Sequence, residues 1–199
     1  MDKILTVTNL EKSFHTREGE IKALDSISFD VSDKEFISIV GPSGCGKSTI
    51  LSILAGLEEK SNGEISFSKD YTIGYMLQND SLFEWRTVLE NCLLGLEVTK
   101  KLTKENKDYV IYLLKTYGLG EFMDEYPSRL SGGMRQRVAL IRTLATKPDI
   151  LLLDEAMSAL DYQSRLAISD DIYKIIKKEG KTAVSYTHLR AHETRGNLV

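Results

Sequence analysis

The chain has 199 residues, of which 42% are hydrophobic and 28% are charged, with a formal net charge of -3. This length and composition allow one large domain, or a core domain with a small subdomain, and the slight negative charge argues against nucleic acid as a partner. Two cysteines fit a reducing cytosol better than a disulfide framework. The apolar runs are far too short to span a bilayer, so a role at a membrane requires a separate anchoring partner.

The N-terminal part of the chain alternates short apolar runs with turns. In chain order, strands are predicted at residues 4–10, 27–31, 36–40, 64–67 and 72–77. The polar, glycine-containing residues 15–20 form the turn between the first two strands. A glycine loop follows the third strand, and it leads into a helix predicted over about residues 47–57. The run at 36–40 is typical of a buried parallel strand.

The second half of the chain is mainly helical in pattern. From residue 88 to about 123, apolar side chains recur at spacings of three and four, as at Val110, Leu113, Leu114 and Tyr117. Another helix is predicted over about 132–145, then a buried strand at 150–153, and then an amphipathic helix marked by Leu166, Ile172, Ile175 and Ile176. Alternating strands and helices predict an α/β fold with a largely parallel sheet.

A complete P-loop pattern follows the third predicted strand. Its residues are Gly41, Pro42, Ser43, Gly44, Cys45, Gly46, Lys47, Ser48 and Thr49. The glycines let backbone N–H groups turn toward phosphate oxygens, and the following helix points its positive end at the same anion. Lys47 is expected to reach the β and γ phosphates, and the Ser48 hydroxyl to bind Mg²⁺. A chance glycine turn is disfavoured because the whole pattern matches directly after an apolar strand.

Two acids end the predicted strand at 150–153. Asp154 is expected to hold Mg²⁺ through water, and Glu155 to polarise the attacking water. Acids also follow buried strands simply because the chain reaches the surface there, and the P-loop favours the metal interpretation over this alternative. Gln78 ends the strand at 72–77, where its amide oxygen can touch the Mg²⁺ shell; a lone Gln at a strand end is otherwise an ordinary solvated residue.

The turn at Ser131, Gly132 and Gly133 opens a basic helix about eighty residues after the P-loop. It supplies a hydroxyl, unhindered backbone N–H groups and a helix N-terminus, which together form an anion site. The alternative is an ordinary Ser N-cap. Two glycines at a helix start cost about 1 kcal/mol each relative to Ala in a helix interior, which makes capping alone a poor explanation. Because the P-loop already holds one face of a nucleotide, this turn is expected to serve a nucleotide on another subunit.

Together these motifs resemble the ATP-binding cassette (ABC) ATPases over residues 5–182, in the order P-loop, Gln78, signature at 130–137, and strand with Asp154 and Glu155. The resemblance implies a P-loop NTPase core with an antiparallel β subdomain and a helical signature subdomain at about 88–145. It implies ATP and Mg²⁺ as cofactors and a catalytic site that includes Lys47, Gln78 and Glu155. It also assigns Phe14 to adenine stacking, although an aromatic after a strand otherwise packs in the core, and Asp161 to the link between two sites.

A narrower resemblance, carried by the P-loop with Cys45 and by residues 82–91 and 130–138, is to cassettes of the taurine, sulfonate, nitrate and thiamine-precursor importers. In that group the segment after the Gln meets the membrane subunit. Trp85 then belongs to an exposed docking surface; the alternative is that Trp85 lies in the core.

Some positions depart from the family pattern. Ala156 and Met157 stand where Pro and Phe are usual, and Thr143 replaces a common Ala. From about Val184 the chain resembles a translated sequencing adapter, so we expect a C-terminally truncated domain at 1–183 and a non-native tail at 184–199. His188 lies six residues after Thr182, at the spacing of the family's switch histidine. Coincidence is favoured over a γ-phosphate contact.

The sequence therefore predicts the ATP-hydrolysing subunit of an importer, peripheral to the cytoplasmic side of the membrane. The expected partners are a second cassette, which forms a homodimer with this one, a transmembrane permease and, indirectly, a solute-binding protein. Nucleic acid is not an expected partner. The alternatives are a soluble ABC ATPase without a transport role and an inert truncated cassette. Soluble members usually carry a long coiled coil or a second cassette in the same chain, and this sequence shows neither.

Overall fold

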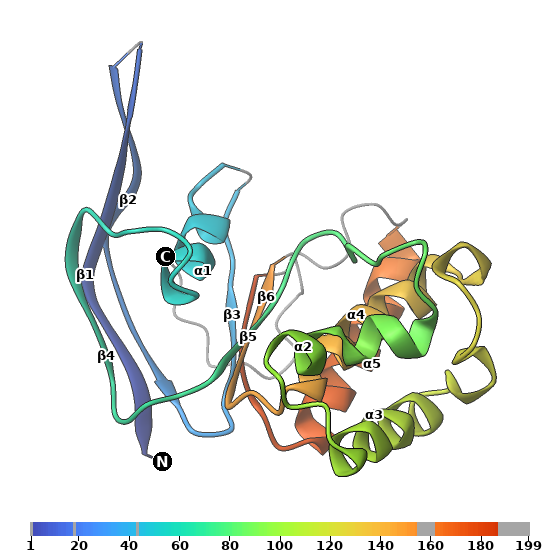
Figure 1. Ribbon diagram of the computed structural model, residues 1–199. Helices are drawn as coiled ribbons and strands as arrows, with labels where there is room; N and C mark the ends of the chain where they lie inside the picture. The colour runs from blue at the N-terminus through green and yellow to red at the C-terminus, as the bar shows by residue number, and fades with distance from the viewer. Residues whose placement is uncertain (1, 18, 43, 155–161, 187–199) are drawn as a thin grey trace.

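The computed structural model describes residues 2–17, 19–42, 44–154 and 162–186. In Figure 1 an antiparallel sheet lies on one side, parallel strands lie in the middle, and most of the helices lie on the other side. The predicted α/β fold, with an antiparallel β subdomain and a helical subdomain, is confirmed by this arrangement. None of the described helices is long and apolar enough to cross a membrane.

The antiparallel sheet has the strand order β2-β1-β4. Its strands are β1 (Lys3–Thr16), β2 (Gly19–Ser32) and β4 (Asn62–Phe67). The first two strands are longer than predicted, because they continue as a ladder of backbone hydrogen bonds from Leu10↔Ile27 to Thr16↔Gly19. Side chains in this outer part are mostly exposed, so no alternation of apolar and polar residues marks it in the sequence.

The parallel sheet has the order β3-β7-β6-β5, and each neighbouring pair is parallel. Its strands are β3 (Phe36–Ile39), β5 (Ile73–Met76), β6 (Ile150–Asp154) and β7 (Thr182–Tyr186). β6 is buried along its whole length, as its run of apolar residues predicts. β7 has no counterpart among the predicted strands, because its apolar run is only Ala183 and Val184, which is too short to show a period.

β7 crosses the expected end of the native domain at about residue 184. Val184 is fully buried, and its Cα pairs with Ile37 on one side and with Leu152 on the other. Residues 187–199, including His188, lie outside the described residues. The origin of this tail therefore stays a prediction.

One face of the parallel sheet is covered by helix α1 (Lys47–Leu54) and by the antiparallel sheet. The buried residues on this side include Leu5, Leu10, Leu51, Ile150, Leu152 and Val184. α1 is shorter than the predicted helix over 47–57. Gly56 adopts the left-handed conformation with φ 71°, which ends the helix before Leu57.

Four longer helices pack on the other face of the sheet. They are α2 (Val88–Val98), α3 (Lys104–Thr116), α4 (Gly132–Ala145) and α5 (Tyr162–Lys178), and the short 3₁₀ turns η1 (Gly120–Phe122) and η2 (Pro127–Arg129) connect α3 to α4. Leu151, Leu153 and Ala183 point to this side, and their strand neighbours point to the α1 side, as strand alternation requires. The sheet therefore separates two apolar cores.

Candidate phosphate and nucleotide site

The loop between β3 and α1 requires glycine at its last position before the helix. Gly46 caps α1 in the left-handed conformation, with φ 90°. A Cβ atom placed on Gly46 would lie 2.3 Å from the carbonyl oxygen of Ala23 on β2. Both the backbone angle and this close approach exclude larger residues, so packing against β2 fixes the direction in which α1 begins.

Lys47 begins α1 and is only 4% exposed. Its ammonium group donates to the carbonyl oxygen of Gly41 at 2.7 Å, to that of Pro42, and to the Cys45 sulfur at 3.2 Å. The loop thus wraps around a buried positive charge at the N-terminal end of a helix. Both features attract an anion, because helix N-termini carry a partial positive charge.

The carboxylate of Asp154, at the end of β6, faces the start of α1. The Ser48 hydroxyl donates to Oδ1 of Asp154 at 2.9 Å, across 106 positions of sequence. The Tyr75 hydroxyl donates to Oδ2 of the same carboxylate at 3.1 Å. Asp154 is 8% exposed, so its two oxygens are satisfied mainly by these hydroxyl groups.

The Tyr75 hydroxyl is a donor at neutral pH. Burial, together with the neighbouring Asp154 carboxylate, raises the pKa of Tyr75 above its usual value of 10.0, although a hydrogen bond with Ser52 opposes the rise. The hydroxyl therefore stays protonated and neutral beside the Asp154 charge.

Ser131 caps α4, and its hydroxyl oxygen accepts a hydrogen bond from the Met134 N–H at 3.4 Å. Ser131 and Gly132 are exposed. A Cβ atom on Gly133 would lie 3.0 Å from Cδ1 of Ile168 on α5, so close helix packing accounts for part of the preference for glycine there. Sequence reasoning assigned both glycines to anion binding and missed this packing role.

Phe14 lies near the outer end of β1 and is 36% exposed. The Lys12 ammonium lies 4.7 Å from the centre of its ring. Lys12 is itself largely buried and is anchored by Glu58 Oε1 and by the carbonyl oxygen of Glu59, both at 2.7 Å. Phe14 is thus an exposed ring with a cation fixed against it.

The predicted residues fall into separate groups. Lys47, Ser48 and Asp154 come together, whereas Gln78 is exposed just after β5. α1 with the P-loop and α4 with the Ser131 turn lie on opposite sides of the parallel sheet (Figure 1). Ser43, Glu155 and Asp161 lie outside the described residues.

Comparison with known proteins decides the family. Residues 24–158 match the ABC transporter family, a span of more than half the chain that includes the P-loop, the Ser131 turn and Asp154. This chain belongs to the ABC transporter family. It is therefore an ATP-binding cassette of a family that hydrolyses ATP.

Individual relatives agree with this assignment. The cassette is 45% identical over 190 residues to the ABC transporter ATP-binding protein YtlC of Bacillus subtilis, covering 92% of this chain and 73% of YtlC. It is 38% identical to the taurine import ATP-binding protein TauB of Roseobacter denitrificans, covering 92% and 71%. Among solved structures, the dimeric, post-hydrolysis cassette MJ0796 bound to ADP and Pi is similar with a TM-score of 0.76 and 32% identity, over 94% of this chain and 88% of that one.

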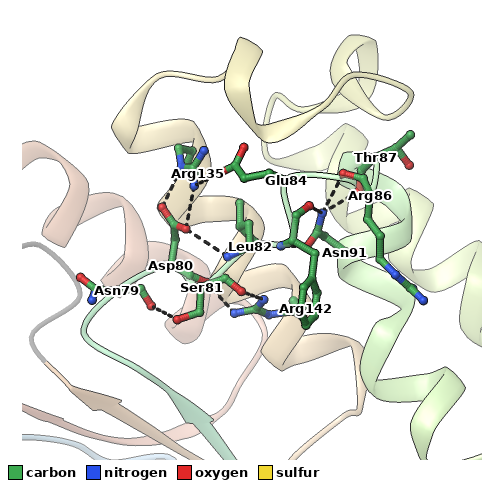
Figure 2. A network of polar contacts seen from close by, with 11 residues as sticks. Asn79, Asp80, Ser81, Leu82, Glu84, Arg86, Thr87, Asn91, Arg135 and Arg142 are labelled. Carbon is green, nitrogen blue, oxygen red and sulfur yellow. Dashed lines mark hydrogen bonds and ion pairs between the residues drawn. The ribbon is translucent and has the colours of Figure 1, made fainter.

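Residues 77–87, which include Gln78, are called the connecting segment. A polar network joins this segment to α4. Arg135 donates from Nε and Nη2 to the two oxygens of Asp80 at 2.8 and 3.0 Å, and from Nη2 to Glu84 at 2.7 Å (Figure 2). Arg142, two turns further along α4, donates to the carbonyl oxygens of Ser81 and Asp80 at 2.8 and 2.6 Å. The connecting segment is therefore hydrogen-bonded to α4 at two positions along the helix, Arg135 and Arg142.

Asp80 is charged in this network. Burial by itself raises its pKa, but the hydrogen bonds from Arg135 and from the Leu82 N–H, with the charges of Arg135 and Arg142, leave the pKa below the usual value of 3.8. The sequence alone did not predict the pairing of Asp80 with Arg135. Arg135 belongs to the signature motif, but nothing in the spacing of the chain connects it to an acid 55 positions earlier.

α2 holds the other end of the connecting segment. The fully buried amide of Asn91 accepts from the Phe83 N–H at 2.8 Å and donates to the carbonyl oxygens of Phe83, Arg86 and Thr87. Between these anchors Trp85 is 73% exposed, with its ring centre 4.9 Å from that of Phe83. Of the two interpretations of Trp85, the core position is wrong and the exposed position is correct.

Proposed function

We propose that this cassette is the ATP-hydrolysing subunit of an importer, which drives uptake of a small solute through a partner permease. The observation that carries the importer role is the exposed Trp85 on a segment fixed between α2 and α4. A large aromatic side chain exposed on a rigid segment is typical of a protein-binding surface. The similarity to TauB, a taurine import protein, supports the same role.

ATP is proposed to bind with its phosphates in the P-loop, against Gly41, Pro42, Ser43, Gly44, Cys45, Gly46, Lys47, Ser48 and Thr49. The Lys47 ammonium exchanges loop carbonyls for phosphate oxygens, which are stronger acceptors because they are charged. The adenine ring stacks on Phe14, whose ring is exposed and braced by Lys12. Stacking and phosphate binding then fix the two ends of the nucleotide.

The oxygen atoms around Asp154 fit a magnesium ion. The Ser48 hydroxyl and the Asp154 carboxylate supply hard oxygen donors 2.9 Å apart. Gln78, which follows β5, is proposed as a further oxygen donor. Mg²⁺ is usually bound through one or two carboxylates together with phosphate oxygens and water. When bound, Mg²⁺ neutralises charge on the phosphates.

Glu155 is proposed as the residue that orients the attacking water, since it follows Asp154 directly in the chain. Lys47 and the backbone N–H groups of the loop stabilise the charge that develops on the transferred phosphoryl group. These roles need no covalent intermediate with the protein.

The complete site is proposed to form between two cassettes. The Ser131 turn and the P-loop lie on opposite sides of the sheet in one chain, so one nucleotide does not reach both. In a dimer each P-loop faces the partner's Ser131, Gly132 and Gly133. The dimeric state of the similar cassette MJ0796 supports this arrangement.

The cassette is proposed to lie at the cytoplasmic side of the membrane, held there by the permease. The permease and a solute-binding protein select the solute. A soluble ABC ATPase without a transport role is the competing function, and an exposed Trp85 on an anchored segment disfavours it.

The test uses the cassette expressed with and without a candidate permease, chosen from the genes that neighbour its own. We expect the cassette to sediment with membranes only when the permease is present, and Trp85→Glu to reduce the bound fraction about tenfold or more, because a central aromatic is removed from the contact. ATPase activity of the free cassette should not change. Tyr112→Glu, which alters another exposed aromatic, is the matched control.

Equal membrane binding of the Trp85→Glu and wild-type proteins would show that Trp85 is not part of a surface that docks on the permease. A cassette that stays in the supernatant with the permease present would instead favour the soluble ATPase.

A further inference from the structure

Tyr75 belongs to none of the motifs that define the nucleotide site, yet its hydroxyl reaches the centre of that site. It lies on β5, in register with Leu152 of the parallel neighbour β6. Leu152 and Tyr75 both pack on the α1 side of the sheet, whereas Met76, Leu151 and Leu153 pack on the other side. Strand alternation therefore directs the Tyr75 ring along the same face as Asp154, two residues after Leu152.

The hydroxyl of Tyr75 is held from two directions. It donates to Oδ2 of Asp154 at 3.1 Å, and it shares a hydrogen bond with Ser52 of α1. The other carboxylate oxygen, Oδ1, accepts from Ser48 at 2.9 Å. Each oxygen of Asp154 thus has its own hydroxyl partner, one from β5 and one from the P-loop helix.

We propose that Tyr75 is a positioning residue for the metal-binding carboxylate, and that it holds Oδ2 of Asp154 so that Oδ1 faces Ser48 and the cation. This proposal rests on the proposed Mg²⁺ site. The phenol ring is rigid and packed against the α1-side core, so its hydroxyl has little freedom to follow a rotating carboxylate. A charge-assisted hydrogen bond to one oxygen therefore restricts rotation of the whole group.

A tyrosine that served only to fill the core would affect stability and nothing else. A positioning tyrosine changes the affinity for the cation in the nucleotide complex while leaving nucleotide binding without metal unchanged. These two outcomes are separable, because Tyr75→Phe removes one oxygen atom and keeps the ring.

The experiment measures Mn²⁺ binding to the protein–ADP complex by electron paramagnetic resonance of free Mn²⁺, with protein in excess so that ADP is bound. Mn²⁺ is used because it takes the same oxygen ligands as Mg²⁺. We expect Tyr75→Phe to weaken Mn²⁺ binding about tenfold, in the range seen when an outer partner of a metal ligand is removed. ADP affinity in EDTA should equal that of the wild type.

Tyr71→Phe is the matched control, since the Tyr71 hydroxyl shares a hydrogen bond with Ser68 at 3.0 Å and Tyr71 precedes β5. It should leave Mn²⁺ binding unchanged. Wild-type Mn²⁺ affinity in Tyr75→Phe would overturn the inference, and so would an equal loss in Tyr71→Phe.

Ser48→Ala separates this inference from the metal site on which it rests. If Ser48→Ala weakens Mn²⁺ binding and Tyr75→Phe does not, only the role of Tyr75 fails. If Ser48→Ala also binds Mn²⁺ like the wild type, the proposed metal site itself fails.

Discussion

At the scale of single residues, the side chains of the proposed nucleotide site are held in place by their neighbours. Lys12 illustrates this most clearly, because it is nearly buried, anchored to Glu58 and to the Glu59 carbonyl, and placed against the ring of Phe14. An aromatic ring that is already held in place loses less conformational freedom when a base stacks on it. Asp154 is likewise held in place, because two hydroxyl groups orient its carboxylate.

Phe14→Leu tests the stacking role. The substitution keeps an apolar side chain but removes the aromatic face, so we expect the dissociation constant for ATP to rise about threefold to tenfold. Fluorescence titration with an ATP analogue measures it. Ile21→Ala is the control, because Ile21 pairs with Phe14 across the hairpin and is itself exposed. An unchanged constant for Phe14→Leu, or the same rise in the control, would contradict adenine stacking at this position.

At the scale of elements, the connecting segment is a short loop that hydrogen bonds attach to two helices. Asn91 anchors it to α2, and Arg135 and Arg142 anchor it to α4. Arg135 lies one turn after the Ser131 cap, at the start of α4. Its bidentate ion pair with Asp80 therefore joins the start of α4 to the residues that follow Gln78. Movement of either one is expected to carry the other.

Asp80→Asn tests this pair through its pH dependence. Because Arg135 holds the pKa of Asp80 below 3.8, the ion pair stabilises the fold above about pH 4, and this stabilisation is lost as pH falls through the lowered pKa. We expect the variant to be about 1 kcal/mol less stable at pH 7, and the difference from the wild type to shrink below pH 4.

Urea unfolding at several pH values measures that difference. Asp30→Asn is the control, since Asp30 pairs with Lys3 at an exposed site, where an ion pair adds little stability. A difference between Asp80→Asn and the wild type that stays constant down to pH 3 would mean that the charge of Asp80 is not the source of the stabilisation.

At the scale of the whole molecule, the parallel sheet divides the cassette into a P-loop side and a signature side. α1 packs with the antiparallel sheet, whereas α2, α3, α4 and α5 share the second core. The P-loop and the Ser131 turn of a single chain therefore lie on different sides of the sheet. In the proposed dimer, a two-fold axis brings the P-loop of each chain to the Ser131 turn of the other.

Mixing two inactive variants tests this assembly. Lys47→Ala removes the ammonium group that is proposed to bind phosphate, and Ser131→Arg places a bulky side chain at the signature turn. Alone, each variant should be inactive, because both sites of its homodimer are defective. In a mixed dimer the intact P-loop of one chain meets the intact Ser131 turn of the other. We expect equal mixing to restore up to about a quarter of wild-type ATPase activity, the share of intact sites in randomly formed dimers. No recovery would argue that each chain completes its own site.

The α/β class and the family could be predicted from sequence alone, and the chemistry assigned to the P-loop stays a prediction. The family was predictable because Gly46, Lys47 and Ser48 are neighbours along one turn and the start of one helix, so their spacing forms a recognisable motif. The helices α2, α3 and α4 were predictable for the same reason, since their apolar spacing is a property of each segment. The length of the β1–β2 hairpin was not predictable, because its outer ladder is made by backbone groups that leave no pattern in the side chains.

The contacts between residues far apart in the sequence came from the three-dimensional packing alone. Tyr75 reaches Asp154 across 79 positions and Arg135 reaches Asp80 across 55, because sheet register and helix packing bring them together. Trp85 had two possible environments from its sequence, and the anchoring of its segment by Asn91 and Arg135 left it exposed. Whether two side chains touch, or one stays exposed, depends on which distant parts of the chain pack against them. A local sequence pattern does not contain this information.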